Sequence, residues 1–279
     1  MVDVPKIVQR ATITLIAVVG LISPSEVQAD LTVTGNFGPY GDIGFATSPT
    51  NLGVTFGAAT GMGSIYQMDA FVNVPGVDLG AGVGMSADLA NGPPTGIGYT
   101  FAASQPTASQ LILGYTFQNN THGTLANFQF LQYVDADIGP NFADEYAVVN
   151  GTNKLGGINP TSFQVGDPSS SSIFTNLTNG TLNNANDFPS PTQSGDVSFA
   201  TAFLLPSLAS GQMITFYVML SDDGSTLGNF SINQHDPVFT GDVLTASAII
   251  PEPSTLVLVA IGSILTLGHR RFYAWTRSQ

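Results

Sequence analysis

Short runs of β-branched and aromatic residues recur along the middle of the chain, separated by clusters of Gly, Pro, Asn and Ser. A spacing of about 8 to 15 residues is typical of antiparallel strands joined by turns, and no long stretch has the period of an amphipathic helix. The expected strands include Ser64–Val74, Ile97–Ala102, Asp144–Val149, Phe230–Asn233 and Val243–Ile249. The pattern predicts an all-β fold, a β-sandwich of the immunoglobulin-like or jelly-roll-like kind.

Four further strands suggest two hairpins. Leu111–Gln118 and Leu125–Tyr133 flank a short Asn- and Gly-containing segment, which favours a turn between them. Val197–Leu205 and Met213–Leu220 form the second expected pair. Between them, the segment Leu205–Gly211 resembles the turn found in immunoglobulin-like domains of bacterial surface proteins.

One long stretch departs from the strand pattern. Gly151–Ser194 is rich in Asn, Ser, Gly, Thr and Pro and contains few apolar residues. Such a composition gives little apolar surface to bury. We expect a surface excursion that is only partly ordered.

The N-terminus has the three-part order of a secretory signal peptide. Two cations precede the apolar run Ala11–Ile22, and small and polar residues follow it. Val27 and Ala29 occupy the positions that signal peptidase reads, so we expect cleavage before Asp30. Residues 1–29 are therefore expected to form a signal helix that is removed.

A proline-containing motif near the C-terminus precedes an apolar run and a pair of arginines. The motif is Pro251-Glu252-Pro253, the run covers residues 254–268, and the arginines are Arg270 and Arg271. This order, within residues 249–279, resembles the PEP-CTERM sorting segment. In that family a membrane-embedded exosortase reads the tripeptide, and the apolar helix with its basic stop holds the substrate in the inner membrane. The resemblance implies these roles for the matching residues here.

The physics of this tail agrees with a membrane helix that begins after Pro253. Two prolines one residue apart block a regular helix and leave an extended peptide ahead of it. Residues 254–268 would form roughly 22 Å of helix, shorter than the roughly 30 Å hydrocarbon core. Arg270 and Arg271 can reach the interface and favour a cytoplasmic end. We expect a single, short transmembrane helix.

Charge and cysteine content exclude several classes of partner and site. Six Lys and Arg face 19 Asp and Glu, for a net charge of −13, and Lys154 is the only cation between Asp30 and Ile250. Such a domain has almost nothing to neutralise phosphates, so we expect neither nucleic acid nor an anionic membrane surface as a partner. The chain has no Cys, which excludes disulfides and thiolate zinc sites.

The clearest candidate for chemistry is a group of acidic residues beside a predicted strand end. Asp135, Asp137, Asp144 and Glu145 could supply oxygen ligands to Ca²⁺. The spacing does not fit an EF-hand, which requires Gly at the sixth position and Glu at the twelfth. The alternative is a set of acids on a solvated loop. Apart from Ca²⁺, no cofactor is expected.

Signals for catalysis are sparse. His122 and His235 are the two histidines between the terminal segments, and no Gly-x-Ser-x-Gly elbow accompanies them. Glu145 is the only Glu in the same region, which leaves few residues for a pair of catalytic carboxylates. We expect no enzymatic activity, and a secreted hydrolase is the least favoured class.

The sequence thus predicts one β domain over residues 30–248 between two processed ends. The resemblance implies an exosortase as a partner besides signal peptidase, a transient stay in the inner membrane, and a Gram-negative host that makes exopolysaccharide, itself a further expected partner. The expected role is structural or adhesive, at the cell surface or in the extracellular matrix. The alternative is a surface module that binds glycan or calcium.

Overall fold

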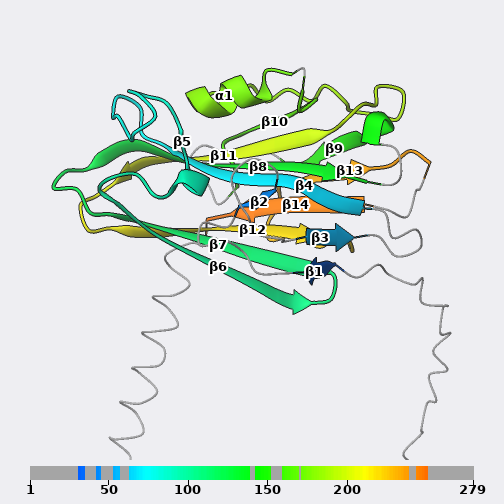
Figure 1. The fold of residues 1–279 in the computed structure, drawn as a ribbon, viewed down its shortest axis with the longest axis horizontal. Helices are drawn as coiled ribbons and strands as arrows, with labels where there is room; N and C mark the ends of the chain where they lie inside the picture. The colour runs from blue at the N-terminus through cyan, green and yellow to red at the C-terminus, as the bar shows by residue number, and fades with distance from the viewer. Residues whose placement is uncertain are drawn as a thin grey trace, which may run out of the picture.

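The molecule consists of two antiparallel β-sheets in facing layers (Figure 1), consistent with the expected all-β sandwich. The computed structural model describes residues 31–34, 42–44, 53–56, 63–138, 142–151, 159–169, 171–238 and 243–250. Short alternating runs rich in Val, Ile, Thr and Phe form the strands, because such side chains pack well on a pleated surface.

The larger sheet has eight strands in the order β1-β3-β4-β8-β11-β10, with β2 and β5 also paired to β4. Its strands are β1 Thr32–Thr34, β2 Ile43–Gly44, β3 Gly53–Phe56, β4 Gly63–Asn73, β5 Ala87–Asp88, β8 Leu125–Asp137, β10 Ser162–Gly166 and β11 Ser198–Leu208. The short 3-10 helix η1, Leu89–Asn91, follows β5.

The smaller sheet has six strands in the order β6-β7-β12-β14-β13-β9. Its strands are β6 Ile97–Thr107, β7 Gln110–Asn119, β9 Tyr146–Asn150, β12 Met213–Ser221, β13 Ser231–His235 and β14 Val243–Ile249. Two further helices are η2 Phe142–Asp144 and α1 Ile173–Asn179. The predicted strands corresponding to β4, β6, β9, β13 and β14 are all confirmed, and β14 has the predicted bounds.

An aromatic core fills the space between the sheets. Phe128 and Phe130 of β8 alternate with residues of the opposite face and contact side chains of the smaller sheet. The ring centroids of Phe130 and Phe216 lie 4.8 Å apart, and those of Phe117 and Phe128 lie 5.5 Å apart. Burial of such large rings is the main contribution that joins the two layers.

Both predicted hairpins are wrong. β7 pairs with β6 and β12, whereas β8 pairs with β4 and β11, so β7 and β8 lie in different sheets. β11 and β12 are likewise in different sheets. The reason is that a buried face can be satisfied in either layer of a sandwich, and alternation alone does not say which layer a strand joins.

The crossover from β7 to β8 and the crossover from β11 to β12 lie side by side and are held together by Asn119. Its fully buried side chain donates to the carbonyl oxygens of Gly123 and Leu208, both at 2.8 Å. Its backbone pairs with Gly211 and Gln212 of the other crossover. The Asn- and Gly-containing segment therefore stabilises a turn from one sheet to the other.

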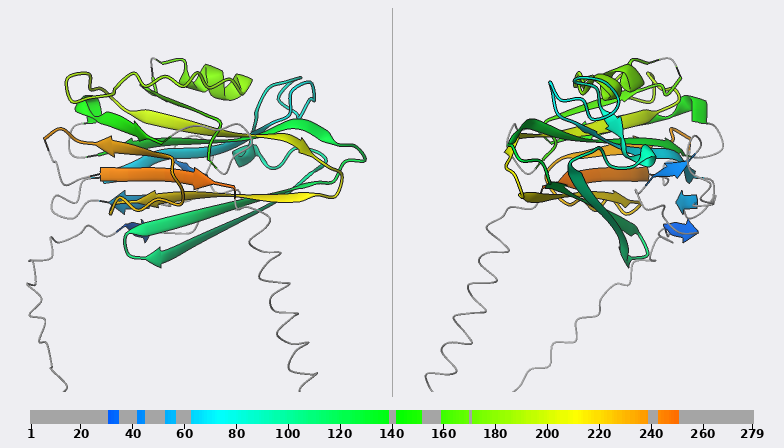
Figure 2. Two further views of the ribbon diagram at one scale, coloured as in Figure 1. Left: turned by 180° about the vertical axis from the view of Figure 1, so that it is seen from behind. Right: turned by 60° about the vertical axis from the view of Figure 1, so that its left-hand side comes forward.

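The expectation of a partly ordered excursion over residues 151–194 is wrong for the described part of that stretch. It contains β10 and α1, and α1 lies over the outer face of the eight-stranded sheet (Figure 2). Ile173, Leu177 and Leu182 form a second buried cluster there, together with Leu131 and Tyr133 of β8. A few well-spaced apolar side chains thus order a mostly polar segment.

The predicted processing segments lie outside the described residues. This applies to the signal peptide with Ala29 and Asp30, to Pro251, Glu252 and Pro253, to the helix over residues 254–268, and to Arg270 and Arg271. Within the described part of the chain, no helix is both long enough and apolar enough to cross a membrane.

Candidate functional site: an acidic cavity

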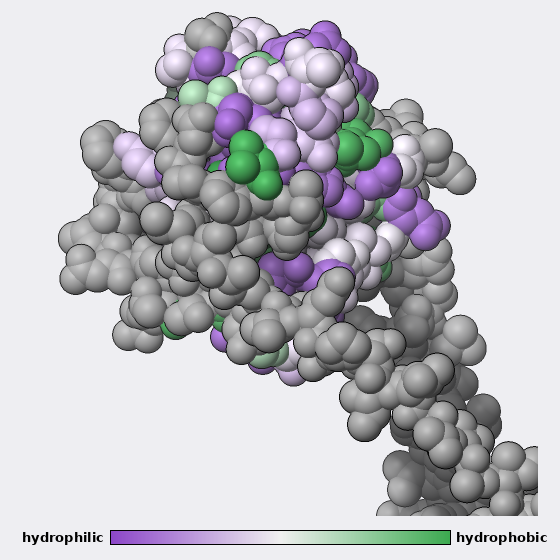
Figure 3. Space-filling model, turned by 90° about the vertical axis from the view of Figure 1, so that its right-hand side faces the viewer, coloured by the Kyte–Doolittle hydropathy of each residue, from purple (hydrophilic) through white to green (hydrophobic). Residues whose placement is uncertain are grey.

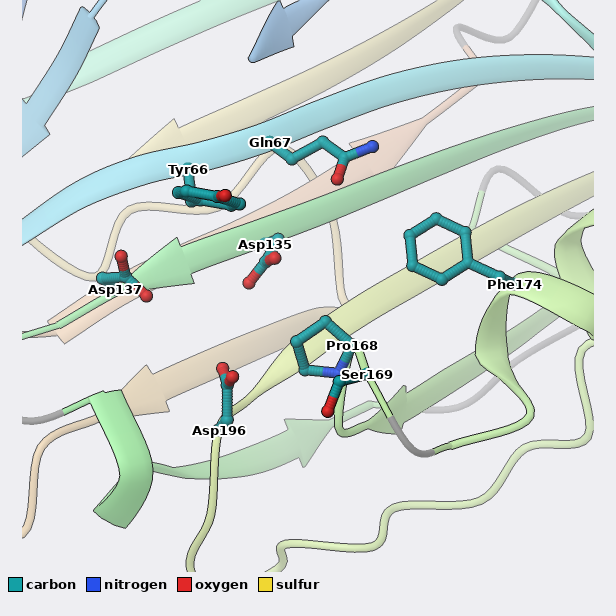
Figure 4. A pocket seen from close by; sticks show the side chains of 8 residues that line it. All are labelled: Tyr66, Gln67, Asp135, Asp137, Pro168, Ser169, Phe174 and Asp196. Atoms are coloured by element: carbon teal, nitrogen blue, oxygen red, sulfur yellow. The ribbon is translucent and has the colours of Figure 1, made fainter. Parts of the chain in front are cut away.

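A cavity of about 630 Å³ opens on the outer face of the eight-stranded sheet. Residues of β4, β8, α1 and the segments before α1 and β11 line it: Tyr66, Gln67, Asp135, Asp137, Pro168, Ser169, Phe174 and Asp196. Figure 4 shows Asp135 in the middle, with Tyr66 on one side and Phe174 on the other. Carboxylates therefore lie between two aromatic walls.

Strand register brings three of these carboxylates together. Asp135 and Asp137 project from the same face of β8, since side chains alternate along a strand. Asp135 lies opposite Ser198 of β11, and Asp196 precedes Ser198 by two residues, which places it beside Asp137. One carboxylate oxygen from each of Asp135, Asp137 and Asp196 lies within 4.8 Å of the others.

Burial and mutual repulsion make the charged forms of these acids unfavourable. Burial, followed by the charges of Asp196 and Asp137, raises the pKa of Asp135 to about 7. Burial and the charge of Asp167 raise the pKa of Asp196 to about 6. Burial also raises the pKa of Asp137. No Lys or Arg occurs in the part of the chain that the structure describes, so no described cation pairs with these carboxylates.

The cluster differs from the predicted set of four acids. The structure brings Asp135 and Asp137 together but places neither Asp144 nor Glu145 in the cluster, which contains Asp196 instead. Asp144 lies at the end of η2 and is half-exposed. Proximity in sequence was a poor guide, because β8 ends before these two residues and the chain turns away from its outer face.

Glu145 is buried in a different environment. Its carboxyl group accepts hydrogen bonds from the backbone N–H of Ile138, from Gln234 Nε2 at 2.6 Å and from the backbone N–H of Val197 at 3.4 Å. Burial nevertheless raises the pKa of Glu145 to about 9, because these donors only partly offset desolvation. Glu145 therefore joins β8, β13 and the start of β11 as a neutral, structural group at pH 7.

Sequence reasoning missed Asp196. It stands just before a predicted strand in a Gly-Asp-Val context, which by itself indicates only a turn or strand start. The pairing of β8 with β11 is what makes it a neighbour of Asp137. Only a correct strand order could have revealed it.

Neither of the two described histidines lines the acidic cavity. His122 is exposed in the crossover after β7. His235 stacks on Tyr146 with ring centroids 5.0 Å apart, and burial lowers its pKa. Among the described residues, neither His235 nor Glu145 hydrogen-bonds to an acidic or basic side chain.

At one end of the molecule, the described residues expose few hydrophobic side chains (Figure 3). Figure 3 shows them as small separate patches among hydrophilic ones. Such isolated patches are normal for a protein surface. The acidic cavity is thus a more distinctive feature than any apolar patch visible on that face.

Compared with known proteins, the chain matches no protein-family model and no curated protein sequence.

Proposed function

We propose that this protein is exported and then sorted by an exosortase, and that it serves as a structural or adhesive protein at the cell surface or in the extracellular matrix of a Gram-negative bacterium. The observation that carries the proposal is the succession of Pro251-Glu252-Pro253, an apolar run and Arg270-Arg271. Signal peptidase would remove residues 1–29 by cutting between Ala29 and Asp30. An exopolysaccharide is the proposed partner outside the cell.

The limits of the described strands support this proposal. The first strand, β1, begins at Thr32, and the last strand, β14, ends at Ile249. Cleavage before Asp30 and near Pro251 would therefore leave every described strand intact. The acidic composition of the domain also agrees with a partner that is a neutral polymer rather than a nucleic acid.

A finer description of the fold belongs to the same proposal. We infer a sandwich of the jelly-roll-like or immunoglobulin-like kind, because the chain crosses between the sheets after both β7 and β11. We also infer a signal helix at the N-terminus and one membrane helix over residues 254–268, held in the inner membrane until the exosortase acts. Both helices rest on the sequence pattern alone.

The test compares the full chain with a Pro251→Ala/Glu252→Ala/Pro253→Ala variant in a Gram-negative host that contains an exosortase. Membrane, medium and matrix fractions are probed for the protein. The wild type should leave the membrane, and the variant should remain there. The matched control is the wild-type chain in the same host without its exosortase, which should also remain in the membrane.

Identical fractionation of the wild type and the variant in the exosortase-containing host would contradict the proposal. The apolar segment would then act as a permanent anchor, and the β domain would remain tethered to the membrane.

A further inference from the structure

We propose that the outer face of the six-stranded sheet lies against lipid headgroups while the tail of the protein is anchored in the membrane. The inference rests on the proposed membrane helix over residues 254–268 and adds how the folded domain is oriented on the membrane. The contact surface is the outer side of β6, β7 and β12, which we call the uncharged face. Thr100, Ala102, Met213 and Tyr217 are among its exposed side chains.

The two sheets differ in the charge of their strands. The described strands of the six-stranded sheet contain no Asp, Glu, Lys or Arg. The strands of the eight-stranded sheet contain Asp69, Asp88, Asp135 and Asp137. Taking an ionised carboxylate out of water is costly, and anionic lipids repel it. The sheet whose strands have no carboxylates is therefore the one that can approach a lipid surface.

Strand register makes the uncharged face continuous with the end of the last strand. Ile249 of β14 lies opposite Tyr217 of β12. Tyr217 in turn lies opposite Gly114 of β7, which lies opposite Ala102 of β6. The Tyr217 ring lies close to Gly114, where an added Cβ would be 3.2 Å from it. An exposed tyrosine on an uncharged surface suits a membrane interface, where rings with a polar tip are enriched.

The position of β14 directs the chain toward this face. β14 is an inner strand between β12 and β13, and it ends at Ile249, opposite the middle of β12. The inner side of the sheet is filled by the core there, because Val218 and Ala248 are buried. The outer side is therefore the one that can face a membrane. β14 also runs along β12 in the direction of Met213, which is 59% exposed.

The connection between β14 and the proposed membrane helix is short. Residues 251–253 alone separate Ile250 from Ser254, where the helix is expected to begin. Even fully extended, the chain from Ile250 to Ser254 spans at most roughly 14 Å. The headgroup layer takes up about 5 to 8 Å of that distance. The folded domain therefore cannot stand clear of the membrane, and since the tail supplies the attachment, the contact needs no positive charge.

This orientation turns the acidic cavity away from the lipid. In Figure 1, α1 lies on one side of the sandwich, and β6, β7 and β12 lie on the opposite side. Facing sheets are about 10 Å apart, and a helix adds about another 10 Å. A residue on the exposed side of α1 should thus lie roughly 20 Å farther from the lipid than the uncharged face.

The experiment uses single fluorescent labels, which the absence of cysteine from the chain makes possible. Ala102→Cys carries the fluorophore on the uncharged face, and Thr175→Cys carries it on the exposed side of α1. The full-length chain, purified from a host without an exosortase, is reconstituted into phosphatidylcholine vesicles that contain a lipid with a nitroxide quencher on its headgroup. Flotation of the vesicles establishes membrane binding. Quenching should be about twofold or more stronger at Ala102→Cys than at Thr175→Cys, because α1 lies farther from the lipid.

Met213→Glu in the Ala102→Cys background tests whether the face itself contacts lipid. The new carboxylate has to stay in water, so the quenching should fall by about half. Val83→Glu is the matched control, because Val83 is 71% exposed but lies between β4 and β5 of the other sheet. It should leave the quenching unchanged. Equal melting curves by circular dichroism show that both variants are folded.

Two results in chains that float with the vesicles would overturn this inference alone. One is quenching at Ala102→Cys that does not exceed quenching at Thr175→Cys, as expected if a second copy of the chain covers the face. The other is unchanged quenching in the folded Met213→Glu variant. A full-length chain that does not float would instead overturn the membrane helix, and with it the membrane step of the proposed export. The two proposals therefore fail in distinguishable ways.

Discussion

At the scale of single residues, Glu145 links the stability of the protein to pH. Its ordinary pKa is 4.5, and burial raises the pKa in the folded protein to about 9. Between these values the folded protein keeps a proton that the unfolded chain has lost. The contribution of Glu145 to stability is therefore greatest below about pH 4.5, and this contribution falls as the pH rises toward 9.

We predict that Glu145→Gln weakens this dependence, because glutamine has a similar shape and no proton to lose. In urea unfolding series from pH 5 to 8 with chelator present, the wild-type free energy of unfolding should fall more steeply than that of the variant. The difference in slope should be at most about 1.4 kcal/mol per pH unit, the value for one proton. Parallel lines for the two proteins would show that Glu145 is charged in the folded state.

At the scale of elements, α1 packs on the eight-stranded sheet and is a structural part of the domain. Leu177 is completely buried between α1 and the outer face of the eight-stranded sheet. We predict that Leu177→Ala lowers the free energy of unfolding by about 2 to 5 kcal/mol, as expected when a buried leucine leaves a cavity. Denaturant unfolding followed by circular dichroism measures the change.

Thr175→Ala is the matched control for α1, because Thr175 is exposed on the same helix. It should change stability by no more than about 0.5 kcal/mol. Equal effects of the two substitutions would mean that α1 does not pack on the sheet, as the polar composition of residues 151–194 suggested.

The elements also show which parts of the fold the sequence could predict. Alternating apolar residues located β4, β7, β8 and β14 within a few residues, because this alternation is a local property. The pairing of β7 with β12 and of β8 with β11 was not predictable in the same way. Short connections favour hairpins, yet here Asn119 stabilises crossovers through contacts that are distant in the sequence.

The candidate site was likewise predictable from the sequence only where its residues are local in the chain. Asp135 and Asp137 could be found, because they follow each other at a spacing of two in an acidic segment. Asp196 joins them only through the register of β8 against β11. Asp144 and Glu145 were included because they are close in sequence, and the chain then turns them toward other surroundings.

At the scale of the whole molecule, the distribution of cations separates the ends of the chain from its middle. Five of the six cations, Lys6, Arg10, Arg270, Arg271 and Arg277, lie in the terminal segments. There they flank apolar runs, the arrangement expected for segments handled at a membrane. The middle of the chain has Lys154 as its only cation. Neither predicted cleavage site interrupts a described strand between Thr32 and Ile249.

Intact mass spectrometry of the wild-type protein recovered from the medium and matrix of an exosortase-containing host tests the central claim most directly. The proposal predicts a chain that begins at Asp30 and ends near Pro251. A protein outside the cells that still extends through Arg271 to Gln279 would contradict it.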